Sequence, residues 1–256
     1  MNVAKLAPHF IARELRERYR GSFTGFGWAL LQPLLQLAIY SFVFVQVFKA
    51  RLPGADAPGY VPFLVVGLWP WAAFSDAIAR ATSSIQDNAG LIGKVALPRA
   101  VLVLAPCAAS FLLHMAGFVA IVVALALAGK GILLAWLPVA LLLYVPLFVL
   151  AFGFALALAA LQVFVRDLAQ VIGQALMLMM FLSPVFYTRA NLPADWQGAL
   201  DLNPFTFYAE SFRSLLLGYG DFDLHRLLVA CAIALVALAA GHWLFRRLDP
   251  HFEDFL

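Results

Sequence analysis

Carboxylates in the second half of the chain are the first groups to test for chemistry, because two positioned carboxylates can act as general acid and general base. Asp195, Asp201 and Glu210 all fall within residues 189–224. Their spacing gives no pair that must meet in space. A membrane-embedded enzyme built on them therefore stays an alternative interpretation, and the sequence predicts no catalytic residue.

The sequence lacks the motifs that bind nucleotides and metals. A phosphate-binding loop reads Gly-x-x-x-x-Gly-Lys-Ser/Thr. The nearest stretch ends in Gly93-Lys94, but Asn88 stands at the first glycine position and Val95 follows the lysine. The sequence contains no His-Glu-x-x-His and no Cys/His cluster with metal-ligand spacing. We therefore expect this chain to bind no metal or cofactor itself.

The composition places these residues in a membrane protein. Hydrophobic residues make up 64% of the 256 residues and charged residues only 12%, whereas soluble domains are about 45–50% apolar and about 25% charged. Cys107 and Cys231 both lie in apolar runs, which favours packing roles over a disulfide. We expect an all-α, polytopic membrane protein.

Uncharged runs set the expected topology, because a crossing helix needs about 20 apolar residues and a charge at its centre costs about 2.5–3.5 kcal/mol. The runs are 21–48, 57–75, 100–129, 131–165, 168–188 and 227–245, and they predict six transmembrane helices. The fourth run is too long for one crossing. Its helix should begin near Trp136–Pro138, after the short turn AGKG at 128–131.

The distribution of lysine and arginine sets the orientation. A cytoplasmic N-terminus places 11 of these residues inside and 6 outside, and the positive-inside rule favours that arrangement, with both termini cytoplasmic. The inside set is Lys5, Arg13, Arg16, Arg18, Arg20, Arg80, Lys94, Arg99, Arg166, Arg246 and Arg247, and the outside set is Lys49, Arg51, Lys130, Arg189, Arg213 and Arg226.

Two connections between the predicted spans are long enough to have a role. Residues 80–99 form a cytoplasmic connection between the second and third spans. Residues 189–224 form an outer connection whose apolar pieces are too short to span, and they predict two short re-entrant helices that dip into the outer leaflet. No tandem repeat interrupts the chain, so we expect one domain over residues 1–256.

The first 22 residues are expected to form an amphipathic helix at the cytoplasmic interface. At helical spacing, Arg13, Arg16 and Arg20 share one face, opposite an apolar arc. Glu14 and Glu17 would repel anionic lipid headgroups. A helix that contacts another protein therefore fits better than a pure lipid anchor.

Polar and aromatic residues inside spans are candidates for function. Asp76 and Arg80, at i and i+4, are expected to pair at the end of the second span. Sugar rings have apolar faces that stack on aromatic rings, so an aromatic-lined channel would suit a glycan. The candidate channel residues are Tyr40, Phe44, Trp69, Trp71, Phe181, Phe186 and Tyr187.

A set of motifs, in order along the chain, resembles one family. The stretches RYRGSFTGFGWALLQPLLQLAIYSFVF, NAGLIGKVALPRAVLVLAP, VRDLAQV, SPVFY and LNPFTFYAESFRSLLLG resemble permease subunits of type-2 ABC exporters that move polysaccharides. This class includes exporters of O-antigen, teichoic acid and capsule. Each motif alone is loose, but the ordered set covers nearly the whole chain.

The resemblance implies a six-span subunit that works as a homodimer in the bacterial inner membrane, with the pore between the two copies. Two separate ATP-binding subunits would hydrolyse ATP, and the substrate would be a polysaccharide on an undecaprenyl-diphosphate type of lipid. The N-terminal helix would contact the ATPase and stand at the substrate entry. A cytoplasmic coupling helix between the second and third spans would also contact the ATPase, and outer helices near 194–202 and 204–217 would cap the pore exit. The ATPase-coupling candidates are Asp87, Asn88, Leu91, Ile92, Arg166 and Asp167.

Two rival interpretations remain at the level of sequence. A type-2 permease for a drug or a small lipid would share the architecture, but it would not need Trp69 and Trp71. A membrane-embedded enzyme acting on lipid-linked sugars would instead use the outer carboxylates.

Overall fold

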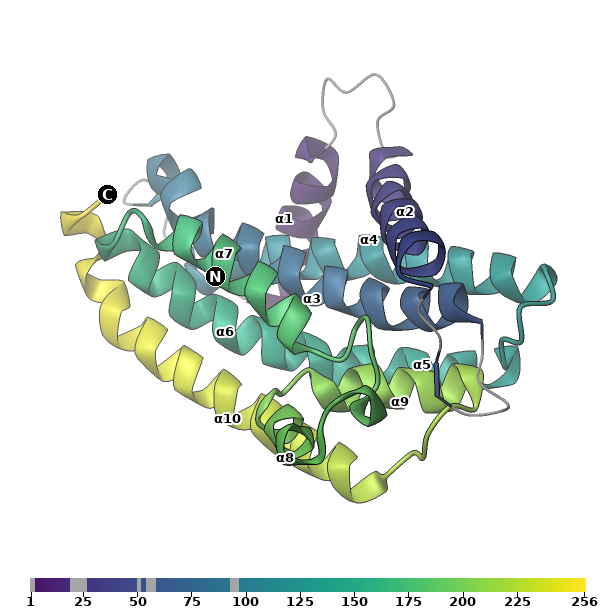
Figure 1. Ribbon diagram of the computed structural model, residues 1–256. Helices are drawn as coiled ribbons and strands as arrows, with labels where there is room; N and C mark the ends of the chain where they lie inside the picture. Colours follow the sequence, from purple (N-terminus) through teal and green to yellow (C-terminus); the bar gives the residue numbers. More distant parts are fainter. Residues whose placement is uncertain (1–2, 19–26, 50–51, 54–58, 93–96) are drawn as a thin grey trace.

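The fold is a bundle of long helices. A computed structural model describes residues 3–18, 27–49, 52–53, 59–92 and 97–256, and every regular element in these ranges is helical. The long helices lie side by side, and α1 and α2 project from one flank of the bundle (Figure 1). This confirms the all-α prediction.

The helices follow one another in the order expected from the uncharged runs. They are α1 (Val3–Glu17), α2 (Gly27–Ser41) with the π-helical η1 (Phe42–Val47), α3 (Tyr60–Asp87), η2 (Ala89–Leu91), α4 (Ala100–Leu127), η3 (Leu134–Trp136), α5 (Leu137–Leu142), α6 (Tyr144–Phe164), α7 (Leu168–Leu182), η4 (Arg189–Asn191), α8 (Ala194–Gln197), η5 (Gly198–Leu202), α9 (Thr206–Leu217), α10 (Leu224–Leu248) and η6 (Asp249–Asp254).

Helix α3 forms the centre of the core. It packs against α4, α6 and α9, and the residues from Pro62 to Trp71 are all buried. On the far side of α6, α10 packs so closely that a Cβ at Gly241 would collide with the backbone oxygen of Gly153. The small residues let two backbones meet, as at many interfaces between membrane helices.

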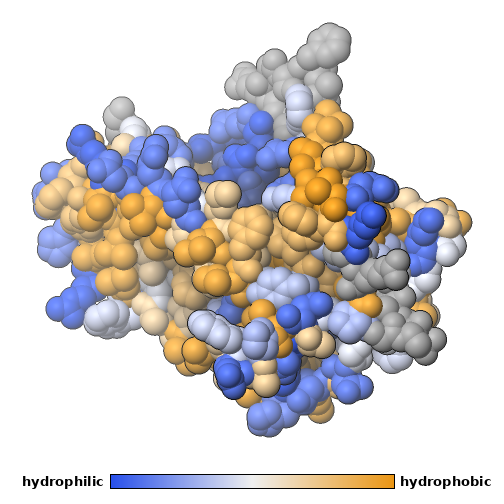
Figure 2. Space-filling model, in the orientation of Figure 1, coloured by the Kyte–Doolittle hydropathy of each residue, from blue (hydrophilic) through white to orange (hydrophobic). Residues whose placement is uncertain are grey.

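Four helical segments are long and apolar enough to cross a membrane. They are Tyr60–Asp87, Ala100–Leu127, Leu134–Phe164 and Leu224–Asp254. Two shorter apolar segments, Leu31–Val47 and Leu168–Leu182, correspond to the first and fifth predicted spans. The chain is therefore a membrane protein with four span-length segments among the described residues, and the six-span count remains a prediction. Apolar side chains cover much of the visible face (Figure 2).

Several predicted boundaries need adjustment. Helix α3 continues to Asp87, so the first residues of the predicted cytoplasmic connection are helical. The described remainder of the predicted coupling helix is the short turn η2, while residues 93–96 lie outside the described residues. The AGKG turn contains two glycines of positive φ, Gly129 and Gly131, and the predicted outer helices correspond to α8–η5 and α9.

Candidate functional site

The predicted interface helix and the predicted coupling connection meet at one hydrogen bond. Nη2 of Arg13 on α1 donates to Oδ1 of Asn88, just beyond α3, over 2.6 Å. The amide of Asn88 in turn donates to the carbonyl of Ser84 over 2.9 Å. Arg16 is exposed and donates to the carbonyl of Ala12 on its own helix. Arg20 lies outside the described residues.

A buried glutamine ties the same end of α3 to the turn between α6 and α7. Gln162 is 3% exposed. Its amide nitrogen donates to Oε1 of Gln86 over 3.0 Å and to the carbonyl of Arg166 over 2.9 Å. Its Oε1 accepts from the backbone N–H of Ala169, and its carbonyl accepts from Gln86. Buried amides of this kind are costly unless every group is paired, so this network fixes the turn.

The remaining coupling candidates surround this network. Asp87 is exposed and accepts from the hydroxyl of Ser83 over 3.0 Å. Leu91 is half-buried, and Ile92 packs against the hydrophobic core. Arg166 and Asp167 are exposed in the α6–α7 turn. The structure thus gathers Arg13, the end of α3 and this turn at one end of the bundle, and their role in coupling remains a prediction.

The arginine at the end of the coupling connection is held by a distant part of the chain. Arg99 donates to the carbonyl of Asp249 and, over 3.0 Å, to its Oδ1. It also donates to Glu253. The start of α4 is thereby fixed to η6, which follows α10. No pattern in the sequence indicates these two contacts.

A cluster of ionisable groups lies inside the bundle. Asp76 on α3 accepts from Arg18 over 2.6 Å and from Arg80 over 2.9 Å, and Nε2 of His114 on α4 lies 3.5 Å from its Oδ2. The predicted Asp76–Arg80 pair is confirmed. The sequence did not indicate Arg18 or His114 as partners. Charges within membrane proteins are paired in this way because an unpaired charge there is costly.

Arg18, Asp76 and His114 of this cluster line a cavity of about 440 Å³ between α2, α3, α4 and α7. The polar lining side chains are Arg18, Gln32, Gln36, Ser75, Asp76 and His114, and the aromatic ones are Trp28, Tyr40 and Trp71. Gln32, Gly173 and Met177 line the cavity and are exposed, so the cavity opens to the surface between α2 and α7. A cavity that combines aromatic walls with polar side chains can bind an organic ligand.

Four of the predicted aromatic residues come together. Phe186 stacks on Phe44 with 5.1 Å between ring centroids and on Phe181 with 5.3 Å, and it meets Tyr40 edge-on at 4.9 Å. The hydroxyl of Tyr60 donates to the Phe186 carbonyl. Tyr60 was not among the predicted residues, although its aromatic ring and its place near the start of the uncharged run 57–75 are visible in the sequence.

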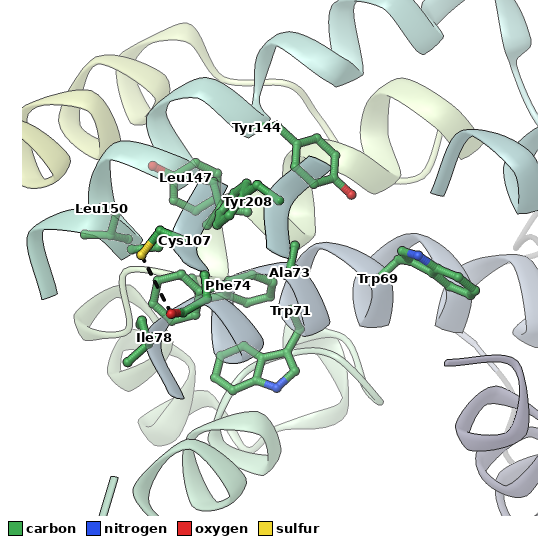
Figure 3. Packing of buried hydrophobic residues seen from close by; sticks show 14 of the residues in the cluster. Trp69, Trp71, Ala73, Phe74, Ile78, Cys107, Tyr144, Leu147, Leu150 and Tyr208 are labelled. Carbon is green, nitrogen blue, oxygen red and sulfur yellow. Dashed lines mark hydrogen bonds between the residues drawn. The ribbon is translucent and has the colours of Figure 1, made fainter. Parts of the chain in front are cut away.

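The other predicted aromatic residues are separate from this group. Trp69 is 1% exposed and packs beside Gly117, where a Cβ would lie 3.0 Å from its indole nitrogen. Trp71 packs on Phe205 and lines the cavity. Figure 3 shows the two indoles well apart. Tyr187 is half-buried. Of the tandem tryptophans, only Trp71 borders the cavity.

Arginines hold the outer region together. Arg213 was expected in the outer loop, yet it is 2% exposed. It donates to the carbonyls of Pro184 and Val185 and lies over the ring of Phe63, 3.5 Å from its centroid. A Cβ at Gly67 would collide with its guanidinium. The motifs SPVFY and LNPFTFYAESFRSLLLG are therefore in direct contact.

The outer carboxylates are engaged in ion pairs. Arg189 contacts Asp201 at 2.6 Å and Glu210 at 3.2 Å, and Arg226 contacts Glu210 at 3.0 Å. Hydrogen bonds from Arg189 lower the pKa of Asp201, and those same bonds raise the pKa of the Arg189 guanidinium. Asp195 is exposed on α8. An acid–base pair needs one carboxyl group with a raised pKa, and this arrangement gives Asp201 the opposite shift.

Comparison with known proteins identifies the family. Residues 9–217 match the family described as ABC-2 type transporter, which covers α1 from His9 through α9. The chain belongs to the ABC-2 type transporter family. This agrees with the resemblance read from the motifs.

Similar members of the family are named as polysaccharide permeases. The chain is 31% identical to an O-antigen export system permease protein RfbA from Myxococcus xanthus over 95% of this chain and 92% of that one. It is 27% identical to a protein of the same name from Klebsiella pneumoniae, with the same coverage. It is 23% identical to the polysialic acid transport protein KpsM from Escherichia coli, over 81% and 80%.

Within this ABC-2 type transporter, the sequence identified several site residues singly but not their connections. The sequence predicts Arg13, Asn88 and Trp71 as site residues, but it does not predict Gln86, Gln162 or the partners that Asp76 has on other helices. Glutamine in the uncharged run 131–165 was the one available signal for Gln162.

Proposed function

We propose that the chain is the permease subunit of an ATP-driven exporter that moves a lipid-linked polysaccharide, such as an O-antigen, across the bacterial inner membrane. The observation that carries this proposal is the match with O-antigen export permeases over 95% of this chain and 92% of theirs. The carrier lipid would be of the undecaprenyl-diphosphate type. The aromatic and polar cavity between α2 and α7 fits a carbohydrate passing through.

The proposed topology has six crossings within a single domain, residues 1–256, with both termini cytoplasmic. Four crossings are the span-length segments, and α2–η1 and α7 supply the other two. Residues 1–22 are the interface helix, 80–99 the coupling connection and 189–224 the re-entrant outer region. In this orientation Arg13, Asn88 and the α6–α7 turn all face the cytoplasm.

The proposed assembly contains two copies of this chain with the pore between them. Support comes from the cavity, which opens between α2 and α7 beside exposed apolar residues such as Ile39, 61% exposed, and Leu178, 61% exposed. A lipid-facing mouth would place Gln32 and the Asp76 cluster next to hydrocarbon, which polar groups avoid. A second copy of the chain facing this side would place the opening of the cavity in a water-filled pore between the two copies.

The energy source in this proposal is a pair of ATP-binding subunits, with ATP and Mg²⁺ bound there. The sequence around Gly93-Lys94 lacks the residues of a phosphate-binding loop. The surface proposed for their contact consists of Arg13, Asn88, Leu91 and the exposed Arg166 and Asp167.

The proposal is tested by deleting the gene in its native host and measuring surface polysaccharide. We expect the surface glycan to disappear while lipid-linked glycan accumulates inside, with recovery when the gene is restored. Gentle purification with intact mass measurement should give two copies of this chain with two ATP-binding subunits. Unchanged surface glycan after deletion would overturn the proposal. So would a chain that purifies alone and converts lipid-linked sugar without ATP.

A further inference from the structure

We propose that Arg99 and η6 form a clasp that positions the end of the coupling connection for the ATP-binding subunits. The clasp consists of Arg99, Asp249, Phe252 and Glu253. The inference deepens the proposed function, on which it rests, because it gives a segment outside the predicted coupling surface a part in linking ATP hydrolysis to export. Arg99 would act through the connection as a positioning residue, without contact with ATP or with the transported chain.

The guanidinium of Arg99 joins two parts of the chain that are far apart in sequence. Arg99 is the last residue of the coupling connection and the N-cap residue of α4. Its Nη1 donates to the carbonyl and to Oδ1 of Asp249, over 2.5 Å and 3.0 Å, and its Nη2 donates to Oε1 of Glu253. The planar fork of an arginine serves several acceptors in one fixed orientation, which a lysine does not. The contact therefore fixes the direction of this side chain as well as its position.

Phe252 fastens η6 to the helices beside it. Phe252 is 0% exposed. Its ring packs on Phe245 of α10, with 5.5 Å between centroids, and on Phe164 of α6, with 6.2 Å. The Arg99 guanidinium lies 6.0 Å from the centroid of the same ring. The acceptors of Arg99 are therefore carried by a segment that is packed into the bundle.

The clasp lies at the end of the bundle that carries other coupling candidates. Phe164, which packs on Phe252, precedes the exposed Arg166 of the α6–α7 turn by two positions. Phe164 also meets Phe255 edge-on at 4.8 Å, and η6 lies beside the α6–α7 turn (Figure 1). A partner that docks on this turn therefore docks next to the clasp.

Side-chain hydrogen bonds hold the part of the connection beyond α3 at two points. One is Asn88, bound by Arg13, and the other is Arg99, bound by η6. Without the clasp, a force on the connection would shift it relative to α10, so α4 and α10 would not move together. The Arg99 side chain is 19% exposed and that of Glu253 is 57% exposed, and such ion pairs add little to the free energy of unfolding. The clasp therefore suits a role in positioning better than a role in stability.

The ratio of export to ATP hydrolysis tests the inference. Complexes of the full-length chain with its ATP-binding subunits are purified into lipid nanodiscs, where ATPase rates and melting temperatures are measured. Export is measured in the native host as surface glycan appearing after induction, at equal membrane levels of the chain. The variants are Arg99→Gln, which removes the fork, Arg99→Lys, which keeps the charge, Glu253→Gln, which changes one exposed acceptor, and the double variant Arg99→Gln/Glu253→Gln.

Matched controls carry the same kinds of substitution beside the clasp. Arg246→Gln changes an exposed arginine on α10, one helical turn before η6. Asp254→Asn changes an exposed acidic residue that directly follows Glu253. These controls alter the charge of this end of the bundle as much as the test variants do, but they leave the contacts of Arg99 in place.

We expect Arg99→Gln to export about fivefold less glycan, as the loss of a charged hydrogen bond predicts. The ATPase rate of the complex and its melting temperature should change little. Arg99→Lys should recover part of the export. Glu253→Gln should lose less than Arg99→Gln does, and the double variant should match Arg99→Gln, because both substitutions break the same clasp. Both controls should export as the wild type does.

Normal export by Arg99→Gln would overturn the inference. So would a loss of export that follows a loss of stability or of ATPase activity, and so would equal losses in Arg99→Gln and Arg246→Gln. The wild-type complex reports separately on the proposed function. A wild-type chain that purifies without ATP-binding subunits overturns the proposed function, whereas export that Arg99→Gln leaves unchanged overturns the clasp alone.

Discussion

Arg13 and Asn88 are separated by 75 residues in the chain, yet their side chains lie 2.6 Å apart. This bond joins the N-terminal helix to the segment that follows α3. Helix α1 is thereby held to the bundle by a polar contact as well as by its packing on α4.

The Arg13–Asn88 bond is expected to matter for export. Arg13→Gln removes the charged donor, whose side chain is 37% exposed. We therefore expect the free energy that holds α1 against the bundle to fall by about 1 kcal/mol, and export to become about fivefold slower. Arg16→Gln is the control, because Arg16 bonds only within its own helix among the described contacts. Export by both variants is measured as surface glycan appearing after induction. Equal losses of export in the two variants would show that the Arg13–Asn88 hydrogen bond is not required for export.

Gln162→Leu should destabilise the protein and weaken its association with the ATP-binding subunits. The substitution leaves the Ala169 N–H and Oε1 of Gln86 without their partner, and each unpaired buried group costs about 1–3 kcal/mol. Thermal unfolding and co-purification measure the two effects. Gln170→Leu, at an exposed position on α7, should change neither. A normal melting temperature for Gln162→Leu would contradict the role assigned to the network.

The two tryptophans of α3 should respond differently to leucine. Trp69→Leu opens a cavity in the core beside Gly117, and large-to-small changes of this kind cost about 2–5 kcal/mol, so its melting temperature should fall. Trp71 is also buried, so Trp71→Leu should likewise lower the melting temperature, but it also removes a wall of the α2–α7 cavity and should lower export more than Trp69→Leu does. Melting curves measure the effect of each variant on stability, and surface glycan measures its effect on export. Full export by both variants would favour a permease for a different class of substrate.

Gly241→Ala should destabilise the packing of α10 on α6. The added methyl group collides with the backbone of Gly153, which cannot rotate away as a side chain could. Overpacking typically costs about 1–3 kcal/mol. Gly173→Ala is the comparison, because a Cβ there meets nothing. Thermal unfolding measures the stability of both variants. A Gly241→Ala protein as stable as Gly173→Ala would show that α10 can shift away from α6 at little cost.

The outer ion pair predicts a dependence on acid. Arg189 lowers the pKa of Asp201 in the folded state, so the pair contributes stability above the unfolded pKa of about 3.9 and loses it as pH falls through the folded pKa. Asp201 is half exposed, so the contribution is small. Melting temperatures of wild type and Asp201→Asn from pH 6 to pH 3 should converge at the acidic end. A difference in melting temperature that stays constant from pH 6 to pH 3 would argue against the Arg189–Asp201 ion pair.

The long helices followed from the sequence because uncharged runs of about 20 residues have few alternatives in a membrane. Helix ends were less predictable. Asp76 and Arg80 interrupt the second run, which suggested that the span ended there, whereas α3 continues to Asp87. Pairing with Arg18 and His114 makes the charge of Asp76 tolerable. That compensation comes from other helices and cannot be read from local sequence.

The same limit applies to the candidate site. The basic face of α1 and the polar end of α3 were recognisable separately, because each has a local pattern. Their contact depends on how α1 crosses the bundle. Trp69 and Trp71 are only two positions apart, so they point in different directions from one helix, yet which of them borders a cavity depends on where α2 and α7 pack.

Arg99 has a consequence for the order in which the protein is made. Its two acidic partners follow 150 and 154 residues later in the chain. The ribosome therefore synthesises every helix from α4 to α10 before the segment after α3 can be fastened at this point. Until then, the described side-chain hydrogen bond that anchors the connection is the one on its α3 side, from Arg13 to Asn88. The nascent chain therefore cannot complete the proposed coupling surface until α10 and η6 have been synthesised.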